Sequence, residues 1–270
     1  MNEVETKEPE PRFSEDVDRW VLLNQLLKGS RRDTVGLHDP ATGTLMIRNP
    51  DQDDAVDILH WNQMEGQTFL VGDWEGKGLD APGFYNPETS VFTLFENFAP
   101  THEPRCFAFG PVGAGWMPVV GDFDGDGQDG VGLYAPEEAT LRLLHTPRDG
   151  DPDHQFLFGP RDSGFIPLAG NWLGEGKDHL ALFDPAIGKF ILKEGLESGD
   201  ADTLVHIGPG RADRLPLMGD WWGQGFEGFA TYDPETSSFR LFFGGRCLET
   251  FIFGDPEEPR IPVRIPWPYR

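Results

Sequence analysis

The sequence predicts an all-β protein, a five-bladed β-propeller with four strands in each blade of about 49 residues, and three repeated markers carry this prediction. A Gly-Asp-Trp-like element recurs every 49 residues, at 71–74, 120–123, 169–172 and 218–221. A turn element with proline in second place keeps that register and has five copies: Asp39-Pro40, Asn86-Pro87, Ala135-Pro136, Asp184-Pro185 and Asp233-Pro234. A Phe-x-Phe-Gly-like segment follows each turn, at 58–61, 107–110, 156–159, 205–208 and 251–254. Four short strands in 40–50 residues are typical of a propeller blade, and five turns indicate five blades.

Each period divides into four strand-like segments. Residues 117–120 are an apolar run, and residues 130–134 alternate with a period of two, as strands do. A Pro-containing turn at 184–188, in which Gly188 tolerates a positive φ, leads to a strand at 189–192. The second segment has a small residue at one position in every blade, which favours placing it innermost, where blades crowd: Gly36, Gly83, Gly132, Ala181 and Ala230.

The two ends of the chain predict how the ring closes. Trp267 falls in the register of the Gly-Asp-Trp aromatic residues, so we expect the C-terminal strand to complete the first blade and remove an open sheet edge. Residues 14–28 form an amphipathic pattern with Ser14 as N-cap and Gly29 after the last turn, which predicts a helix. The expected organisation is therefore a disordered acidic tail at 1–13, a helix at 14–28 and a propeller at 29–270.

Composition and charge exclude several classes of partner. With 46 acidic and 22 basic side chains the formal net charge is −24, which argues against nucleic acid and anionic membrane surfaces. No apolar run reaches 18 residues, so the sequence predicts no helix that spans a bilayer. The N-terminus has neither the basic nor the apolar region of a secretory signal, so the chain as written predicts a cytoplasmic protein; a chain whose signal had been removed would be secreted.

Residues 121–134, which read GDFDGDGQDGVGLY, resemble the FG-GAP/VCBS-type repeats of bacterial β-propellers. The resemblance implies adhesion, ligand binding or protein contact, and a calcium loop formed by Asp122, Asp124, Asp126 and Asp129. Carboxylates at alternate loop positions suit Ca²⁺, which takes six to eight oxygen ligands. The alternative is an Asp-Gly turn that satisfies its own backbone. The corresponding loops place Lys77, Leu173 and Trp222 at ligand positions, so we expect at most one calcium ion and no other cofactor.

One position is acidic in every blade and predicts a ring at one mouth of the channel: Asp33, Asp80, Asp129, Asp178 and Glu227. A residue repeated in each blade suggests a repeated structural task, such as accepting hydrogen bonds from loop N–H groups. The aromatic residues that share one register predict packing between blades: Trp74, Phe123, Trp172, Trp221 and Trp267. Trp222, Trp116 and His179 depart from the repeat and are candidate binding residues, with His179 expected at the channel mouth beside Lys177.

These patterns favour a non-catalytic interaction module that binds a protein partner through its blade loops, where propellers carry specificity. One alternative is a lectin-like, carbohydrate-binding propeller, which predicts pockets of aromatic residues and carboxylates between blades. Another is a glycoside hydrolase-like enzyme, which needs two carboxylates in different environments in the central funnel.

Overall fold

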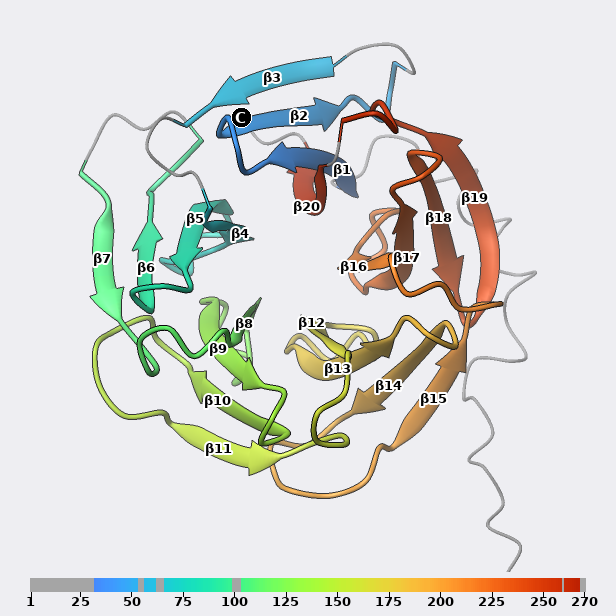
Figure 1. Ribbon diagram of the computed structural model, residues 1–270. Helices are drawn as coiled ribbons and strands as arrows, with labels where there is room; N and C mark the ends of the chain where they lie inside the picture. Colours follow the sequence, from blue (N-terminus) through green and yellow to red (C-terminus); the bar gives the residue numbers. More distant parts are fainter. Residues whose placement is uncertain (1–31, 53–55, 62–65, 99–102, 259, 268–270) are drawn as a thin grey trace, which may run out of the picture.

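The structure is a computed structural model that describes residues 32–52, 56–61, 66–98, 103–258 and 260–267. These residues form five four-stranded antiparallel sheets around a central axis, so the predicted five-bladed β-propeller is confirmed (Figure 1). The tail predicted at 1–13 and the helix predicted at 14–28 lie outside the described residues. Within the described ranges, no helix has the length and apolar character needed to cross a membrane.

The strands of each blade follow one another from the axis outward (Figure 1). Blade 1 contains β20 (Ile261–Trp267), β1 (Arg32–Asp39), β2 (Thr44–Arg48) and β3 (Val56–His60). Blade 2 contains β4 (Thr68–Gly72), β5 (Ala81–Asn86), β6 (Val91–Leu94) and β7 (Arg105–Ala108). Blade 3 contains β8 (Met117–Gly121), β9 (Gly130–Ala135), β10 (Thr140–Leu144) and β11 (His154–Leu157). Blade 4 contains β12 (Ile166–Gly170), β13 (His179–Asp184), β14 (Lys189–Lys193) and β15 (Thr203–His206). Blade 5 contains β16 (Leu215–Gly219), β17 (Gly228–Asp233), β18 (Ser238–Phe243) and β19 (Arg246–Ile252).

The C-terminal strand closes the ring as predicted. Strand β20 pairs antiparallel with β1, in a register that sets Trp267 opposite Arg32 and Val263 opposite Gly36. Blade 1 is thus built from both ends of the described chain, and its innermost strand is the last one in sequence. The first blade leaves no unpaired inner edge on β1, which would otherwise expose a row of backbone donors and acceptors.

The prediction that the repeated small residues lie on the innermost strand is wrong. Neighbouring blades meet at the axis through β20, β4, β8, β12 and β16, whereas the small residues lie on the second strand of each blade. Side chains from both flanking strands cover this position. A Cβ at Gly132 would lie 2.5 Å from Leu143 of β10 and 2.7 Å from Val119 of β8. The small residue therefore makes room for packing within a blade, not for crowding at the axis.

The core lies between adjacent blades. Trp74 and Phe92 of blade 2 pack in one cluster with Val131 and Leu133 of blade 3. Four of the aromatic residues predicted to pack between blades are buried: Trp74, Phe123, Trp172 and Trp221. The fifth, Trp267, is only partly buried and packs against the cluster between blades 1 and 2. Large rings at one repeated position thus join the blades into a single body.

A ring of prolines lines one end of the central channel. Pro118, Pro167, Pro216 and Pro262 occupy equivalent places on the innermost strands, together with Phe69, and border a cavity of about 190 Å³. The innermost strand is a sheet edge, so a proline there removes no inter-strand hydrogen bond. This end of the channel is apolar, and the acidic residues lie at the other end.

Candidate binding site at the acidic mouth of the channel

The acidic residues of the repeat join each blade to its neighbour. The backbone N–H of Asp73 donates to the Asp129 carboxylate across 2.7 Å, and the Asp129 N–H donates back to the Asp73 carbonyl across 2.9 Å. The same pair of bonds links Asp122 with Asp178, at 2.9 and 2.7 Å. It also links Asp220 with Asp33, at 2.8 Å in both directions. We call this reciprocal pair the inter-blade clasp. The geometry fits the structural task predicted for the acidic position.

The glycine of the Gly-Asp-Trp element leaves room for the clasp. A Cβ at Gly72 would lie 2.9 Å from a carboxylate oxygen of Asp129, and a Cβ at Gly121 would lie 2.8 Å from one of Asp178. At Gly170 the corresponding distance to Glu227 would be 2.1 Å. Glycine is therefore required because the acidic side chain of the next blade lies directly on this backbone.

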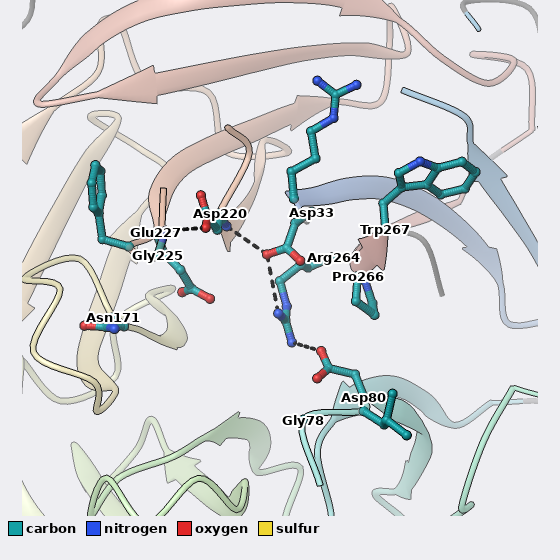
Figure 2. Close-up of a pocket in the computed structure, with 13 residues that line it drawn as sticks. Asp33, Gly78, Asp80, Asn171, Asp220, Gly225, Glu227, Arg264, Pro266 and Trp267 are labelled. Carbon is teal, nitrogen blue, oxygen red and sulfur yellow. Dashed lines mark hydrogen bonds and ion pairs between the residues drawn. The ribbon is translucent and has the colours of Figure 1, made fainter. Parts of the chain in front are cut away.

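The junction between blades 1 and 2 lacks this clasp. Pro266 stands at the position of Asp73, and proline has no N–H to donate to the acidic residue of the next blade, Asp80. The Arg264 guanidinium takes that role, and its Nη2 lies 2.8 Å from Asp80 Oδ2 (Figure 2). Its Nη1 lies 3.4 Å from Asp33 Oδ2. Arg264 therefore links the acidic residue of blade 1, Asp33, with that of blade 2, Asp80.

Burial and mutual repulsion perturb the carboxylates that surround Arg264. Burial is the main cause that raises the pKa of Asp129 to about 7, with a further contribution from Asp178. Burial likewise raises the pKa of Asp178 to about 6 and that of Glu227 well above its ordinary value. It also raises the pKa of Asp33, although Arg264 opposes that shift. We call the group formed by Arg264 and five carboxylates the acidic mouth; the carboxylates are those of Asp33, Asp80, Asp129, Asp178 and Glu227. It contains five acidic groups and one basic group.

A cavity of about 290 Å³ opens at the acidic mouth among blades 5, 1 and 2 (Figure 2). Asp33, Asp80, Glu227 and Arg264 give it a charged lining, and Leu79, Phe226 and Trp267 contribute apolar walls. A second cavity of about 340 Å³ shares Asp80, Glu227 and Arg264 with it and continues along the channel. Carboxylates beside aromatic rings can bind a cation or a hydroxylated ligand.

The predicted calcium loop is only partly assembled. Ligand oxygens of Asp122, Asp124 and Asp126 lie within 4.8 Å of one another, so these three could face one cation. The Asp129 carboxylate accepts the Asp73 N–H in the inter-blade clasp. The Asp122 carboxylate accepts the N–H groups of Gly125, Asp126 and Gly127 at 2.7–3.1 Å. Calcium at this loop stays a prediction, and the backbone of the loop is ordered by Asp122.

The other predicted binding residues do not form one site. Trp116 precedes β8 and Trp222 follows β16, so they lie at opposite ends of the innermost strands. The Arg142 guanidinium covers the ring of Trp116 at 4.1 Å, and Trp222 packs edge-on to Phe243 at 6.5 Å. His179 is 1% exposed and lies 5.4 Å from the Trp172 ring. The expectation that His179 points into the channel mouth is therefore wrong, since it fills space beside the blade 4 tryptophan.

Sequence reasoning missed Arg264, which is central to the site. Alignment of Trp267 with Trp74 also aligns Arg264 with Val71, and the equivalent residues in blades 3, 4 and 5 are Val120, Ala169 and Met218. A single arginine in an otherwise apolar column of the repeat was the available signal. The ring of prolines could have been found in the same way, since four of the five innermost strands have a proline two residues before this position.

No family model matches the sequence, and no curated protein matches it. Several solved structures share the general fold at low identity. They include BBS1N in complex with ARL6DN (8% identity, 82% of this chain and 60% of that chain, TM-score 0.41). A lectin from Agrocybe aegerita that recognises non-reducing terminal N-acetylglucosamine has 11% identity over 86% of this chain and 71% of that chain, with a TM-score of 0.47. AztD from Citrobacter koseri has 8% identity over 88% of this chain and 98% of that chain, with a TM-score of 0.38.

Proposed function

We propose that the protein is a non-catalytic β-propeller module that binds a protein partner through the loops of its acidic mouth. The observation that carries the proposal is the contrast between framework and loop positions. The inter-blade clasp recurs at three junctions, whereas the residue just before the acidic position differs in every blade: Arg32, Leu79, Gln128, Lys177 and Phe226. A constant scaffold that presents different side chains at equivalent places suits recognition of an asymmetric partner surface.

The use of the carboxylates supports a role without catalysis. Asp33, Asp129 and Asp178 each accept a backbone N–H from the neighbouring blade, and Asp80 holds Arg264. A general acid or base must reach a proton of the substrate, and carboxylates that hold the ring together serve another purpose. The kinship to FG-GAP/VCBS-type repeats stays a prediction and is compatible with this proposal.

Leu79 offers the most direct test of the surface. Its side chain is 59% exposed at the rim of the mouth cavity, which makes Leu79→Ser a change with little expected cost to the fold. Val112 is 74% exposed on the connection before β8, at the proline end of the channel, and Val112→Ser is the matched control.

The experiment captures partners from native lysate on immobilised protein, identifies them by mass spectrometry and then titrates the purified partner. We expect Leu79→Ser to raise the dissociation constant of the partner at least tenfold and Val112→Ser to leave it within twofold of the wild-type value. Equal affinity for both variants would contradict the mouth as the binding surface.

A further inference from the structure

The mouth cavity has room beyond the space taken by Arg264. Arg264 lies on the side of Asp33 and Asp80, while the Glu227 side chain projects from the opposite wall (Figure 2). The Arg264 side chain is 26% exposed, so the two cavities that it borders are open to solvent around the guanidinium. The cavity that Glu227, Phe226 and Trp267 help to line is thus open to a ligand.

The charge of this space favours a cation. The groups that act on Glu227 are the carboxylates of Asp33, Asp129 and Asp178, which precede or begin strands of three other blades, and Arg264 of β20. Three negative groups and one positive group therefore surround a carboxylate whose pKa is raised first of all by burial. Within the described part of the chain, no hydrogen bond is donated to the Glu227 carboxylate. A bound cation would compensate this excess of negative charge.

The apolar walls narrow the choice of cation. Phe226 and Trp267 both border the cavity, and the Trp267 ring is anchored by its Nε1–H, which donates to Asp51 Oδ2 at 3.0 Å. Aromatic rings attract arginine and lysine head groups, and the exposed Leu79 provides an apolar surface for the methylene stem. Arg264 itself demonstrates that carboxylates of this mouth accommodate a guanidinium. The planar guanidinium can both stack on a ring and hydrogen-bond to a carboxylate, which a spherical metal ion cannot do.

We propose that the mouth cavity lined by Glu227, Phe226 and Trp267 binds an arginine side chain of the protein partner. The inference rests on the proposed function, since it names the chemistry that the module recognises. The partner presents an arginine whose stem lies along Leu79 and whose guanidinium is held by Glu227.

The test uses isothermal titration calorimetry of the full chain at pH 8 with the peptide acetyl-Gly-Arg-Gly-amide. The control peptide contains citrulline, which has nearly the same shape and no charge. We expect the arginine peptide to bind at least tenfold more tightly than the citrulline peptide. Two results would overturn the proposal: equal affinities for the two peptides, or no binding of the arginine peptide at a concentration of about 10 mM. Both titrations use the wild-type protein, so this comparison does not depend on any variant folding.

A pair of variants then locates the site. Glu227→Gln keeps the size of the side chain, and we expect it to lower the affinity for the arginine peptide at least tenfold. The control Glu175→Gln changes an exposed glutamate in the loop of blade 4, and we expect its affinity within twofold of wild type. Thermal melts establish that both variants are folded. Burial raises the pKa values of Glu227, Asp129 and Asp178, so acidification removes negative charge from the mouth, and we also expect weaker binding at pH 5.5 than at pH 8. An unchanged affinity in Glu227→Gln would place the arginine elsewhere.

Competition separates this inference from the proposed function. If the arginine peptide displaces the purified partner, both are supported. If the partner binds wild type and Glu227→Gln equally, the arginine site is wrong while a partner surface still exists. If the peptide binds at Glu227 but Leu79→Ser has no effect on the partner, the proposed surface is wrong and the arginine site stands as a binding site for small guanidinium ligands.

Discussion

At the scale of single residues, two polar side chains, Asp129 and His38, differ in whether they have a hydrogen-bond partner. Asp129 lies in the clasp and accepts the Asp73 N–H, yet burial still opposes its charge. His38 stands where the other blades have Tyr85, Tyr134, Phe183 and Tyr232, and neither of its ring nitrogens has a hydrogen-bond partner among the described residues. An unpaired buried polar group costs about 1–3 kcal/mol. Both residues therefore reduce stability in ways that a substitution can measure.

We expect Asp129→Asn to stabilise the protein at high pH. The amide oxygen can still accept the Asp73 N–H, and the buried charge is removed. The pKa of Asp129 is about 7 in the folded protein, against the ordinary value of 3.8 expected in the unfolded chain. Ionisation therefore lowers the free energy of unfolding as the pH rises from about 4 to about 7. The gain should be about 2–4 kcal/mol at pH 8, from roughly 1.4 kcal/mol per pKa unit, and should vanish toward pH 4. Urea unfolding at both pH values checks this, with the exposed Asp151→Asn as control. A gain independent of pH would contradict the assignment.

We expect His38→Phe to raise the free energy of unfolding by about 1–2 kcal/mol at pH 7, because it removes two unpaired buried nitrogens. The His38 ring is fully buried and stacks on Phe69 at 5.1 Å, so a phenyl ring suits the site. Burial lowers the pKa of His38 to about 4, so wild type loses stability as the pH falls from 6.5 to about 4, while the variant does not. Chemical denaturation at pH 5 and pH 7 measures the difference. A smaller advantage at pH 5 than at pH 7 would refute this explanation.

At the scale of elements, the loops after β4, β8, β12 and β16 are organised by their first residue, whose side chain accepts backbone N–H groups. Asp122 accepts three backbone N–H groups, and Asp220 accepts those of Gln224 and Gly225 at 2.8 and 2.7 Å. The blade 5 loop has Trp222 and Gln224 where blade 3 has Asp124 and Asp126, yet it has the same turn. The later carboxylates are therefore not needed to shape the backbone of this element.

We expect Asp122→Ala to lower the free energy of unfolding by about 1–3 kcal/mol, since it leaves three loop N–H groups without their acceptor. Asp124→Ala should cost less than about 1 kcal/mol, because its exposed carboxylate lies 3.5 Å from His145 Nδ1 in a surface pair. Thermal melts of both variants measure the difference.

The same melts test the predicted calcium ion. If the loop binds it, millimolar Ca²⁺ raises the melting temperature of wild type and leaves Asp124→Ala unchanged, and equal shifts in the two proteins would contradict calcium binding.

At the scale of the whole molecule, the repeat made the ring predictable. Residues that depart from the repeat were harder to interpret. The 49-residue period identified the blades, the closing role of β20 and the structural use of the acidic position. It did not place the small residues correctly, because a period reports equivalence between blades and not distance from the axis. The position of Arg264 follows from the register, but its partners depend on Pro266 lacking an N–H, a consequence that appears only when five blades meet in three dimensions. His179 was misplaced because an unusual polar residue can fill core space as well as line a mouth.

Arg264 takes the place of the inter-blade clasp between blades 1 and 2, which yields a prediction for the molecule as a whole. Arg264→Gln removes the link between Asp33 and Asp80 and leaves the mouth without its central positive charge. We expect the free energy of unfolding to fall by about 2–4 kcal/mol at pH 8, since a partly buried ion pair that loses one partner leaves an uncompensated charge. The loss should be smaller at pH 5, where the remaining mouth carboxylates bind protons more readily. Arg148→Gln removes an exposed pair with Asp153 and should cost at most about 1 kcal/mol at either pH. Denaturant titrations of the two variants at both pH values provide the measurement. If Arg264→Gln and Arg148→Gln had equal effects, the closure of blade 1 onto blade 2 would rest on β20 pairing and packing alone.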